Sequence, residues 1–352
     1  MKNDRLFISL AIGAVGLSSC VDPSSEDVLE LSIEEQRFAI ADELGSSEPA
    51  PDPATAWSLD DSEDTPTGGN TCGSETMIIG ADNRGAGPSN LLENSPPYDR
   101  VGHITSGAMT QTQVCSGVMI SDRHVLTAAH CLVEWAPEIN GVPTFVPGPL
   151  GFALARSAKC DRPHGVHFAS KAWVPRQYVP DNNSASNKRW DYGVLELANP
   201  IVRAPTMDYR PVVDHTTLEQ NIAVHLGYPS TKAEGTVWWH LGNFLPWESE
   251  AGSTSSVSGL LRVDTDVEGG QSGGPVFVWP NRVVGTMVGS PEHECHQGKV
   301  WAARITEGTA TRLDYVLSGS VYALWTMHKF DFPTVPAELP PTNTCGFGGF
   351  MP

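Results

Sequence analysis

Short runs of apolar residues, separated by turn residues, dominate the chain from about residue 101 onward. Residues 114–120 and 125–128 are two such runs, and the polar Ser-Asp-Arg-His stretch between them predicts a β-hairpin. A Pro-Asn turn between two apolar runs predicts a second hairpin over residues 276–288. Further strands are expected at residues 222–226, 236–240 and 260–263. Many short strands with frequent turns are typical of an all-β protein.

The first twenty residues have the pattern of an export signal. Lys2 and Arg5 precede an apolar run at residues 6–17, which is too short to span a bilayer comfortably. The run ends in Leu-Ser-Ser-Cys, which resembles a bacterial lipobox, so we expect Cys20 to carry lipid. The alternative is an ordinary cleaved signal with an incidental cysteine. No later segment is long and apolar enough to be expected to cross a membrane.

Residues 21–76 are predicted to be an acidic tether or propeptide. Residues 21–75 hold fifteen acidic side chains and one basic one, which accounts for most of the formal net charge of −19. Only residues 28–44 have helical spacing, with Leu31, Phe38 and Leu44 at apolar positions, and we expect little of the segment to be packed. The acidic balance argues against a nucleic-acid partner.

The composition of the whole chain agrees with this organisation. The 352 residues leave room for one large or two modest domains. An apolar content of 40%, with 34 Gly and 28 Pro, fits a turn-rich globular β-protein better than a helical one. If Cys20 is lipidated, six of the seven cysteines remain, and an even number suits disulfides in an exported protein.

Residues 266–275, Asp-Val-Glu-Gly-Gly-Gln-Ser-Gly-Gly-Pro, place Ser272 on a glycine-rich turn. Glycine permits backbone angles that other residues avoid, and backbone N–H groups can be approached freely there. Such a turn suits a serine nucleophile beside an oxyanion site, although a plain Gly-Ser surface turn is the alternative for this segment alone. A serine nucleophile needs a base, and His130 in Thr-Ala-Ala-His-Cys is the candidate.

Thr-Ala-Ala-His-Cys and Gly-Gln-Ser-Gly-Gly-Pro, in this order, resemble the motifs of trypsin-like serine endopeptidases, and within them the bacterial glutamyl endopeptidase branch. Ile-Ile-Gly-Ala-Asp-Asn-Arg at residues 78–84 resembles the start of the mature enzymes in that branch. The resemblance implies a chymotrypsin-like all-β fold of two antiparallel six-stranded barrels with a C-terminal helix. The expected boundaries are an export signal at 1–20, the acidic segment at 21–76, a peptidase domain at 77–328 with barrels at about 78–205 and 206–310, and a Pro/Gly-rich tail at 329–352.

The resemblance also implies the roles of individual residues. Ser272 is expected to be the nucleophile, His130 its base, and Asp191, which enters an apolar strand, the residue that orients His130. Backbone N–H groups of Gly270 and Ser272 are expected to form the oxyanion hole. Neither a metal nor another cofactor is needed for this chemistry. Rival acids, in Pro-rich, Asn-rich or polar surroundings, are Asp161, Asp181, Asp208 and Asp214.

The family has a disulfide at the places of Cys115 and Cys131, so we expect these two residues to pair. Four cysteines then remain, with three possible pairings. Cys295 lies in a His-Glu-Cys-His cluster, which we interpret as containing a disulfide cysteine rather than a metal site. The pairing that we favour is Cys72–Cys345 with Cys160–Cys295.

Gln271, the residue before the nucleophile, departs from the trypsin pattern. Trypsin-type enzymes carry an Asp there, which pairs with a newly cut N-terminus and switches the zymogen on. A neutral Gln cannot form that buried ion pair. Activation must therefore follow another route, or the site is partly formed before cleavage.

The expected pocket residues give conflicting indications of specificity. Asp266 lies where trypsin holds the Asp that selects Arg or Lys. Glutamyl endopeptidases recognise an acidic side chain with a His and a Ser or Thr, and Met287 and Val267 stand near those places. With Gly289, these residues are expected to line the substrate pocket, and a basic residue before the scissile bond is favoured over an acidic one. If Asp266 does not meet a substrate cation it must have another partner, because a buried unpaired carboxylate is costly.

The sequence therefore predicts an exported serine endopeptidase that hydrolyses polypeptides through an acyl-enzyme. We expect a monomer in the cell envelope, or secreted after processing, whose one membrane contact is lipid on Cys20. One alternative is a catalytically weak binding or adhesion protein on a peptidase fold. The other is an esterase with the same triad, which ranks lower because Ser272 lacks the strand–Gly-x-Ser-x-Gly–helix context of those enzymes.

Overall fold

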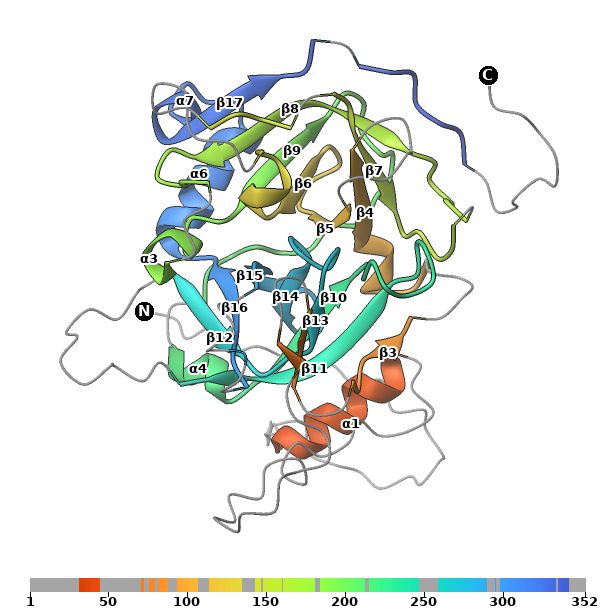
Figure 1. Ribbon diagram of the computed structural model, residues 1–352, viewed down its shortest axis with the longest axis vertical. Coiled ribbons are helices and arrows are strands. Elements are labelled where there is room, and N and C mark those ends of the chain that lie inside the picture. Colours follow the sequence, from red (N-terminus) through yellow and green to blue (C-terminus); the bar gives the residue numbers. More distant parts are fainter. Residues whose placement is uncertain are drawn as a thin grey trace, which may run out of the picture.

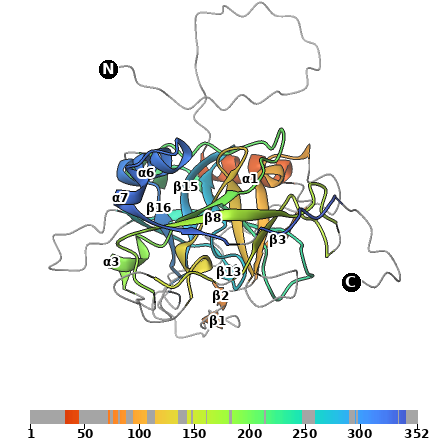
Figure 2. The ribbon, with the colours of Figure 1, turned by 90° about the horizontal axis from the view of Figure 1, so that it is seen from above.

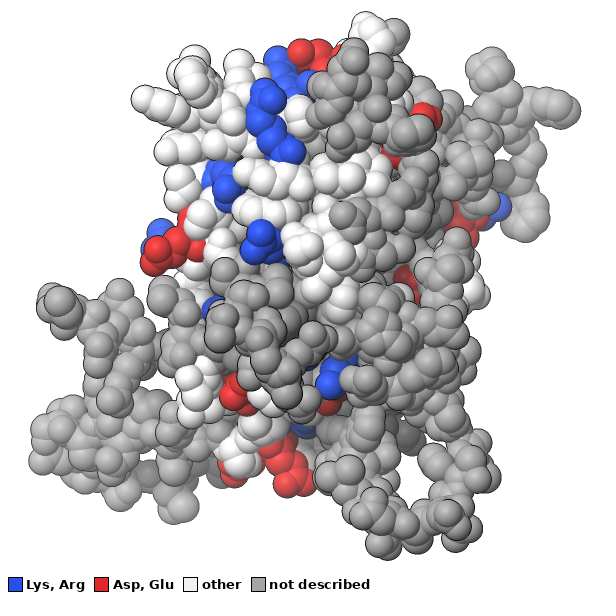
Figure 3. All heavy atoms as spheres, turned by 60° about the vertical axis from the view of Figure 1, so that its left-hand side comes forward, with Lys and Arg blue, Asp and Glu red and all other residues white. Residues whose placement is uncertain are grey.

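The computed structural model is built mainly of β-strands arranged in two barrels, one above the other in Figure 1. Figure 3 shows one face of the molecule, on which basic and acidic side chains are interspersed rather than uniformly acidic. Within the described residues, no helix is long and apolar enough to span a membrane. The structure describes residues 32–44, 71–72, 76–79, 82–87, 94–106, 114–134, 143–146, 148–159, 161–180, 184–212, 215–246, 259–289, 295, 298–333 and 335–341.

The first barrel contains six antiparallel strands in the order β8-β7-β4-β5-β6-β9, and pairing between β8 and β9 closes it. The hairpin expected from residue 114 onward is present as β5 and β6, with Val118 opposite Leu126. Each strand presents apolar side chains to the barrel interior, so closure buries all of them without leaving an open sheet edge. The strands are β4 Val101–Ser106, β5 Val114–Met119, β6 His124–Thr127, β7 Leu150–Leu154, β8 His167–Pro175 and β9 Gly193–Leu197.

The second barrel has the order β10-β14-β15-β16-β12-β11 and is closed by pairing between β10 and β11. The predicted fold of two closed six-stranded antiparallel barrels is thus confirmed. The predicted second hairpin is present as β14 and β15, whereas the strand expected at 236–240 is longer than predicted. The strands are β10 Ile222–Gly227, β11 Trp238–Leu245, β12 Leu260–Val263, β14 Pro275–Val278, β15 Arg282–Met287 and β16 Val300–Arg304.

A continuous apolar core runs through the first barrel and across the contact with the second. Val118 of β5 and Phe277 of β14 both belong to this core and are fully buried. A separate apolar cluster, which includes Leu261 and Met287, fills the inside of the second barrel. The loops that leave both barrels at their mutual contact are therefore held on a rigid base.

Part of the acidic N-terminal segment, within the residues 28–44 expected to be helical, packs on the second barrel. Helix α1, Ile33–Glu43, begins with a capping box in which Ser32 and Glu35 bond each other's backbone N–H. Its C-terminal end buries Ile40, Ala41 and Leu44. Arg37, the one basic residue of the segment, donates to Asn243 Oδ1 at 2.8 Å and to the Leu241 carbonyl at 3.4 Å. The helix lies within residues 28–44, where helical spacing predicted it, but Phe38, which was expected on its apolar face, is exposed.

Three short strands connect the N-terminal segment to the second barrel. β1, Thr71–Cys72, and β2, Thr76–Ile78, form a small antiparallel sheet with β13, Val267–Glu268. A further strand, β3 Gly85–Ala86, extends the second barrel beside β11. Figure 2 places β1 and β2 on the opposite side of the molecule from α1.

The C-terminal region returns to the first barrel. The region of the expected C-terminal helix contains two helices, α6 Glu307–Leu317 and α7 Ala323–Thr326. β17, Met327–Asp331, then pairs with β8, and Leu339 bridges to Val166. The described start of the predicted tail is therefore docked on the first barrel, because its backbone pairs with the C-terminal part of β8 and with Val166. The remaining helical elements are the short η2 Tyr98–Arg100, η3 Ala129–Cys131, α3 Ala185–Lys188 and α4 His215–Glu219.

Candidate active site

His130 and Asp191 come together because the strands that carry them are neighbours in the first barrel. β6 ends just before His130 and β9 begins just after Asp191, and Thr127 pairs with Gly193. His130 Nδ1 lies 2.9 Å from Asp191 Oδ2, and the backbone N–H of His130 donates to Asp191 Oδ1 at 2.9 Å. The carboxylate thus fixes both the ring and the backbone of the histidine.

Asp191 is completely buried and is held in its charged form by its neighbours. Burial alone would raise its pKa, but the charges of His130 and Lys188, together with hydrogen bonds from His130, hold the pKa of Asp191 well below its ordinary range. Lys188 Nζ lies 3.1 Å from Asp191 Oδ2. A carboxylate with a lysine, a histidine and a backbone donor beside it stays ionised across the neutral pH range.

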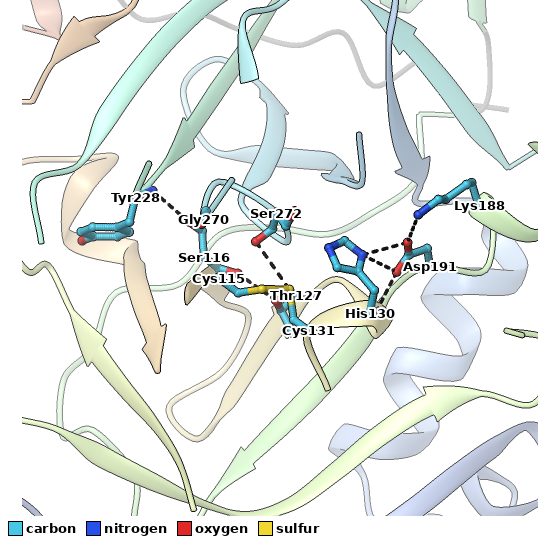
Figure 4. The surroundings of a disulfide bond; sticks show 10 residues. All are labelled: Cys115, Ser116, Thr127, His130, Cys131, Lys188, Asp191, Tyr228, Gly270 and Ser272. Carbon is cyan, nitrogen blue, oxygen red and sulfur yellow. Dashed lines mark hydrogen bonds and ion pairs between the residues drawn. A yellow bond between two sulfur atoms is a disulfide. The ribbon is translucent and has the colours of Figure 1, made fainter. Parts of the chain in front are cut away.

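Ser272 lies on the other side of the His130 ring, in the turn between β13 and β14. Figure 4 shows the imidazole between Ser272 and Asp191. Ser116 of the first barrel holds this turn: its backbone N–H donates to the Ser272 carbonyl at 2.8 Å, and its hydroxyl donates to the Gly270 carbonyl at 2.8 Å. The two barrels therefore fix the relative positions of His130 and Ser272 through direct contacts.

Gly273, which follows the serine, has no room for a side chain. Its φ is +78°, and a Cβ there would lie 2.0 Å from Thr127 Oγ1. Thr127 cannot move away freely, because it donates to the Ser116 carbonyl at 2.7 Å. The glycine is thus required for the close approach of the serine turn to the strand that leads to His130.

The turn also leaves backbone donors near Ser272. The N–H groups of Gln271, Gly273 and Gly274 donate to carbonyls of Glu268, Met287 and Gln271. Within the described part of the chain, the N–H groups of Gly270 and Ser272 make no backbone hydrogen bond. These two are the donors that the sequence predicts for an oxyanion.

The predicted disulfide between Cys115 and Cys131 is confirmed. It links β5 to the residue directly after His130, and Cys131 Sγ lies 3.8 Å from the Ser272 carbonyl. Among the described residues, Cys115, His130 and Cys131 form the only group spaced to share a metal, but its two sulfur atoms are bonded to each other. Cys295 is also disulfide-bonded, as expected. The cysteines whose side chains lie outside the description are Cys20, Cys72, Cys160 and Cys345.

Asp266 has partners within the protein. Its Oδ1 accepts from the backbone N–H of Ile79 at 2.7 Å, and its Oδ2 accepts from that of Asn83 at 3.2 Å. The side chain is buried, and burial raises the pKa of Asp266 to about 6 against the opposing effect of these hydrogen bonds. His240 Nε2 lies 3.9 Å from Oδ2, and burial lowers the pKa of His240 to about 3, so this histidine is neutral at pH 7. The geometry fits the second of the two expectations, that Asp266 already has a partner.

Two other predicted pocket residues are in the core. Val267 pairs with Met77 of β2, and Met287 is completely buried in the second-barrel cluster that also contains Met77. A Cβ at Gly289, which is half-buried, would lie 3.1 Å from Met77 Cε. Strand β2 thus covers these positions, because its apolar side chains complete the interior beside β13. Of the four predicted pocket residues, Gly289 is the one that is not fully buried, so a ligand could contact the chain there.

Sequence reasoning missed three residues around the turn. Ser116, Lys188 and Arg84 each contact a predicted site residue, and no local pattern marks any of them as special. Arg84 ends the motif at residues 78–84, which predicts only where the peptidase domain begins. Of the rival acids, Asp208 pairs with Arg282 and Arg210, the Asp161 carbonyl accepts from the Ser157 N–H, and Asp181 and Asp214 lie outside the described residues.

Comparisons with known proteins find similarity to serine peptidases. The family model described as the trypsin-like peptidase domain matches residues 115–285. A glutamyl endopeptidase of Bacillus licheniformis is 29% identical over 204 residues, which are 57% of this chain and 54% of that protein. Serine protease 23 of Homo sapiens is 28% identical over 99 residues, 24% of this chain and 25% of that protein. The chain thus spans about half of the length of the first of these relatives, and less of the second.

Among solved structures, the model resembles a Glu endopeptidase in complex with MPD. The TM-score is 0.54 at 17% sequence identity, and the match covers 68% of this chain and 99% of the other. A likeness at this identity concerns the fold. It supports the two-barrel architecture that the strand pairings show directly.

Proposed function

We propose that the chain, whose residues 115–285 match the trypsin-like peptidase domain, is a serine endopeptidase in which Ser272, His130 and Asp191 form the catalytic triad. The observation that carries the proposal is the placement of the His130 imidazole between Ser272 and the buried Asp191 carboxylate. With Nδ1 bonded to Asp191, the Nε2 atom is free to face the serine. The same three residue types in this geometry support nucleophilic acyl transfer in unrelated folds.

In the proposed mechanism the Ser272 hydroxyl attacks the carbonyl carbon of the scissile peptide bond, and its proton passes to His130 Nε2. The tetrahedral intermediate collapses when His130 gives this proton to the leaving amine, which leaves an acyl-enzyme on Ser272. Water then attacks the ester, with His130 again as base, and frees Ser272. Asp191 keeps the ring in the required tautomer and stabilises its positive form.

The N–H groups of Gly270 and Ser272 are proposed to bind the oxyanion. Both lack a backbone partner in the described residues, so no hydrogen bond within the fold has to break when the intermediate forms. A single donor of this kind contributes about 3–4 kcal/mol to transition-state stabilisation in comparable enzymes.

We propose an acidic rather than a basic preference before the scissile bond. The leaning toward a basic residue depended on Asp266 meeting a substrate cation, but both of its oxygens accept backbone N–H groups. The Bacillus licheniformis relative is a glutamyl endopeptidase, which favours the acidic alternative. Peptides that differ only in having Glu, Arg or Lys at this position distinguish the two possibilities.

The protein is further proposed to act outside the cytoplasm. The bond between Cys115 and Cys131 and the bonded Cys295 fit an oxidising compartment. The apolar run at residues 6–17 supplies the signal for export.

The test of the triad is hydrolysis of casein and of fluorogenic peptides by wild type, Ser272→Ala and His130→Ala. Each substitution should lower kcat by roughly 10⁴-fold or more while the fold is retained, because triad members act as a unit. Ser318→Ala is the matched control, since this hydroxyl bonds only backbone carbonyls at the end of α6. A serine-directed inhibitor should block wild type. Near-normal turnover by either folded triad variant would show that another site is responsible.

A further inference from the structure

A buried arginine contacts the residue that precedes the proposed nucleophile. Arg84 Nη1 donates to Gln271 Oε1 at 2.8 Å and forms an ion pair with Glu268 Oε2 at 2.7 Å. The Arg84 side chain is only 2% exposed, and Gln271 is completely buried. The chain thus places a positive charge beside the turn where trypsin-type enzymes have an ion pair with the N-terminus.

The charge of Arg84 is balanced on its other side. Its Nε and Nη2 atoms donate to the two oxygens of Asp82 at 2.8 and 2.9 Å. Burial would lower the pKa of Arg84, but the bonds with Asp82 and Glu268 raise it above its ordinary value. Lys232 pairs with Asp82 from outside at 2.8 Å. The contacts with Asp82 and Glu268 fix the guanidinium in place.

Gln271 connects the fixed guanidinium of Arg84 to the serine turn. Its Oε1 also accepts from the Glu268 N–H at 3.1 Å, and its own N–H donates to the Glu268 carbonyl at 3.0 Å. Both ends of the turn from Glu268 to Gln271 are therefore tied to one side-chain oxygen. The N–H groups of Gly270 and Ser272 lie within or next to this turn, so their direction depends on it.

Arg84 belongs to a segment of the chain that is bound to the second barrel. β2 pairs with β13, and Asp266 accepts the N–H groups of Ile79 and Asn83. β1, β2 and β13 lie together at one edge of the molecule. These contacts hold residues 76–79 and 82–84 against the turn in the uncut chain.

We infer that Arg84 is the positioning residue that holds the turn of Gly270–Ser272 in its oxyanion-binding shape and takes the place of a newly cut N-terminus. The inference rests on the proposed function. Under this inference, the buried Arg84 side chain keeps the turn in shape whether or not the chain is cut before residue 76. Gln271 fits this arrangement because a neutral amide accepts from an arginine that two carboxylates already neutralise.

The experiment compares wild type with Arg84→Met, Gln271→Leu, the double variant and Lys232→Met. Lys232→Met is the matched control, because it removes a cation from Asp82 without touching Gln271. Arg84→Met should lower kcat roughly 10²-fold, as the loss of an oxyanion donor does, with KM changed less than about threefold. The double variant should be no worse than the poorer single variant, because both remove the same contact. The control should keep kcat within about threefold of wild type.

Hydrogen–deuterium exchange of the peptide spanning residues 268–274 supplies a readout that needs no activity. Faster exchange of this peptide is expected in Arg84→Met and Gln271→Leu but not in Lys232→Met. If Arg84→Met does not fold, Gln271→Leu and Arg84→Lys decide, since each removes or weakens the contact without leaving two carboxylates unpaired. Unchanged kcat and unchanged exchange in the folded variants would overturn the inference. Wild type that hydrolyses nothing would overturn the proposed function instead, and the exchange data would still decide the role of Arg84.

Discussion

The buried carboxylate of Asp266 should make the stability of the protein depend on pH in a direction opposite to that of most carboxylates. Its pKa is about 6 in the folded protein, compared with about 3.9 for Asp in an unfolded chain. The folded state therefore binds the proton more tightly than the unfolded state does. The stabilising contribution of protonated Asp266 is fully present below pH 4 and is lost as the pH rises through 6.

The size of the effect follows from the pKa difference. About two units correspond to roughly 3 kcal/mol of unfolding free energy, lost between pH 4 and pH 7. Asp266→Asn removes the titration but keeps a similar shape. Asp266 accepts from the backbone N–H groups of Ile79 and Asn83 with two oxygens, whereas Asn has one acceptor oxygen. The variant therefore also loses a hydrogen bond, but the free energy of that loss does not vary with pH.

The assay is urea unfolding of wild type and Asp266→Asn at pH values from 4 to 7.5. Subtracting the two curves cancels the other titrating groups, and the remainder should move by roughly 3 kcal/mol in favour of the variant as the pH rises. A difference that stays flat to within about 1 kcal/mol would refute the reasoning, because ionisation of Asp266 would then carry no burial cost. The same variant tests specificity: its ratio of Glu to Arg hydrolysis should match wild type. A selective loss of Arg and Lys hydrolysis would show that Asp266 meets the substrate.

Three further predictions concern other contacts. Lys188→Met removes the cation 3.1 Å from Asp191 Oδ2, which helps to hold the pKa of Asp191 low, so this pKa should rise and the variant should lose less stability than wild type between pH 7 and pH 3 in urea unfolding; an equal loss would contradict this. Replacing Cys115 and Cys131 together by Ser should cost about 3 kcal/mol in urea unfolding on the chain-entropy model, and a variant as stable as wild type would argue against that role. Cys20→Ser should move the protein from the detergent phase to the aqueous phase, whereas identical partitioning would favour an ordinary signal peptide.

Local patterns were sufficient to predict the hairpins, whereas the two barrels were predicted from the resemblance to trypsin-like endopeptidases. The runs around β5, β6, β14 and β15 are short, apolar and joined by polar turns, so each hairpin is encoded by about fifteen neighbouring residues. The juxtaposition of His130 and Asp191 follows once β6 and β9 are neighbours. What the motifs could not supply is the set of contacts that hold the serine turn, because Ser116 and Arg84 reach it from 156 and 188 positions away in the sequence, counting to Ser272.

The errors concern residues whose environment is set by the N-terminal segment. Composition indicated that little of residues 21–76 would pack, since acidic, Ser-rich and Pro-rich chains bury too little apolar surface. It did not show that the expected helix would bury three apolar side chains and Arg37, or that Met77 of β2 would fill the space beside Val267. Once that strand is in place, a residue such as Asp266 faces backbone N–H groups rather than an open pocket. The pocket residues of a peptidase therefore cannot be assigned from the motif around the nucleophile alone, because what lies against the pocket wall is encoded almost two hundred residues earlier.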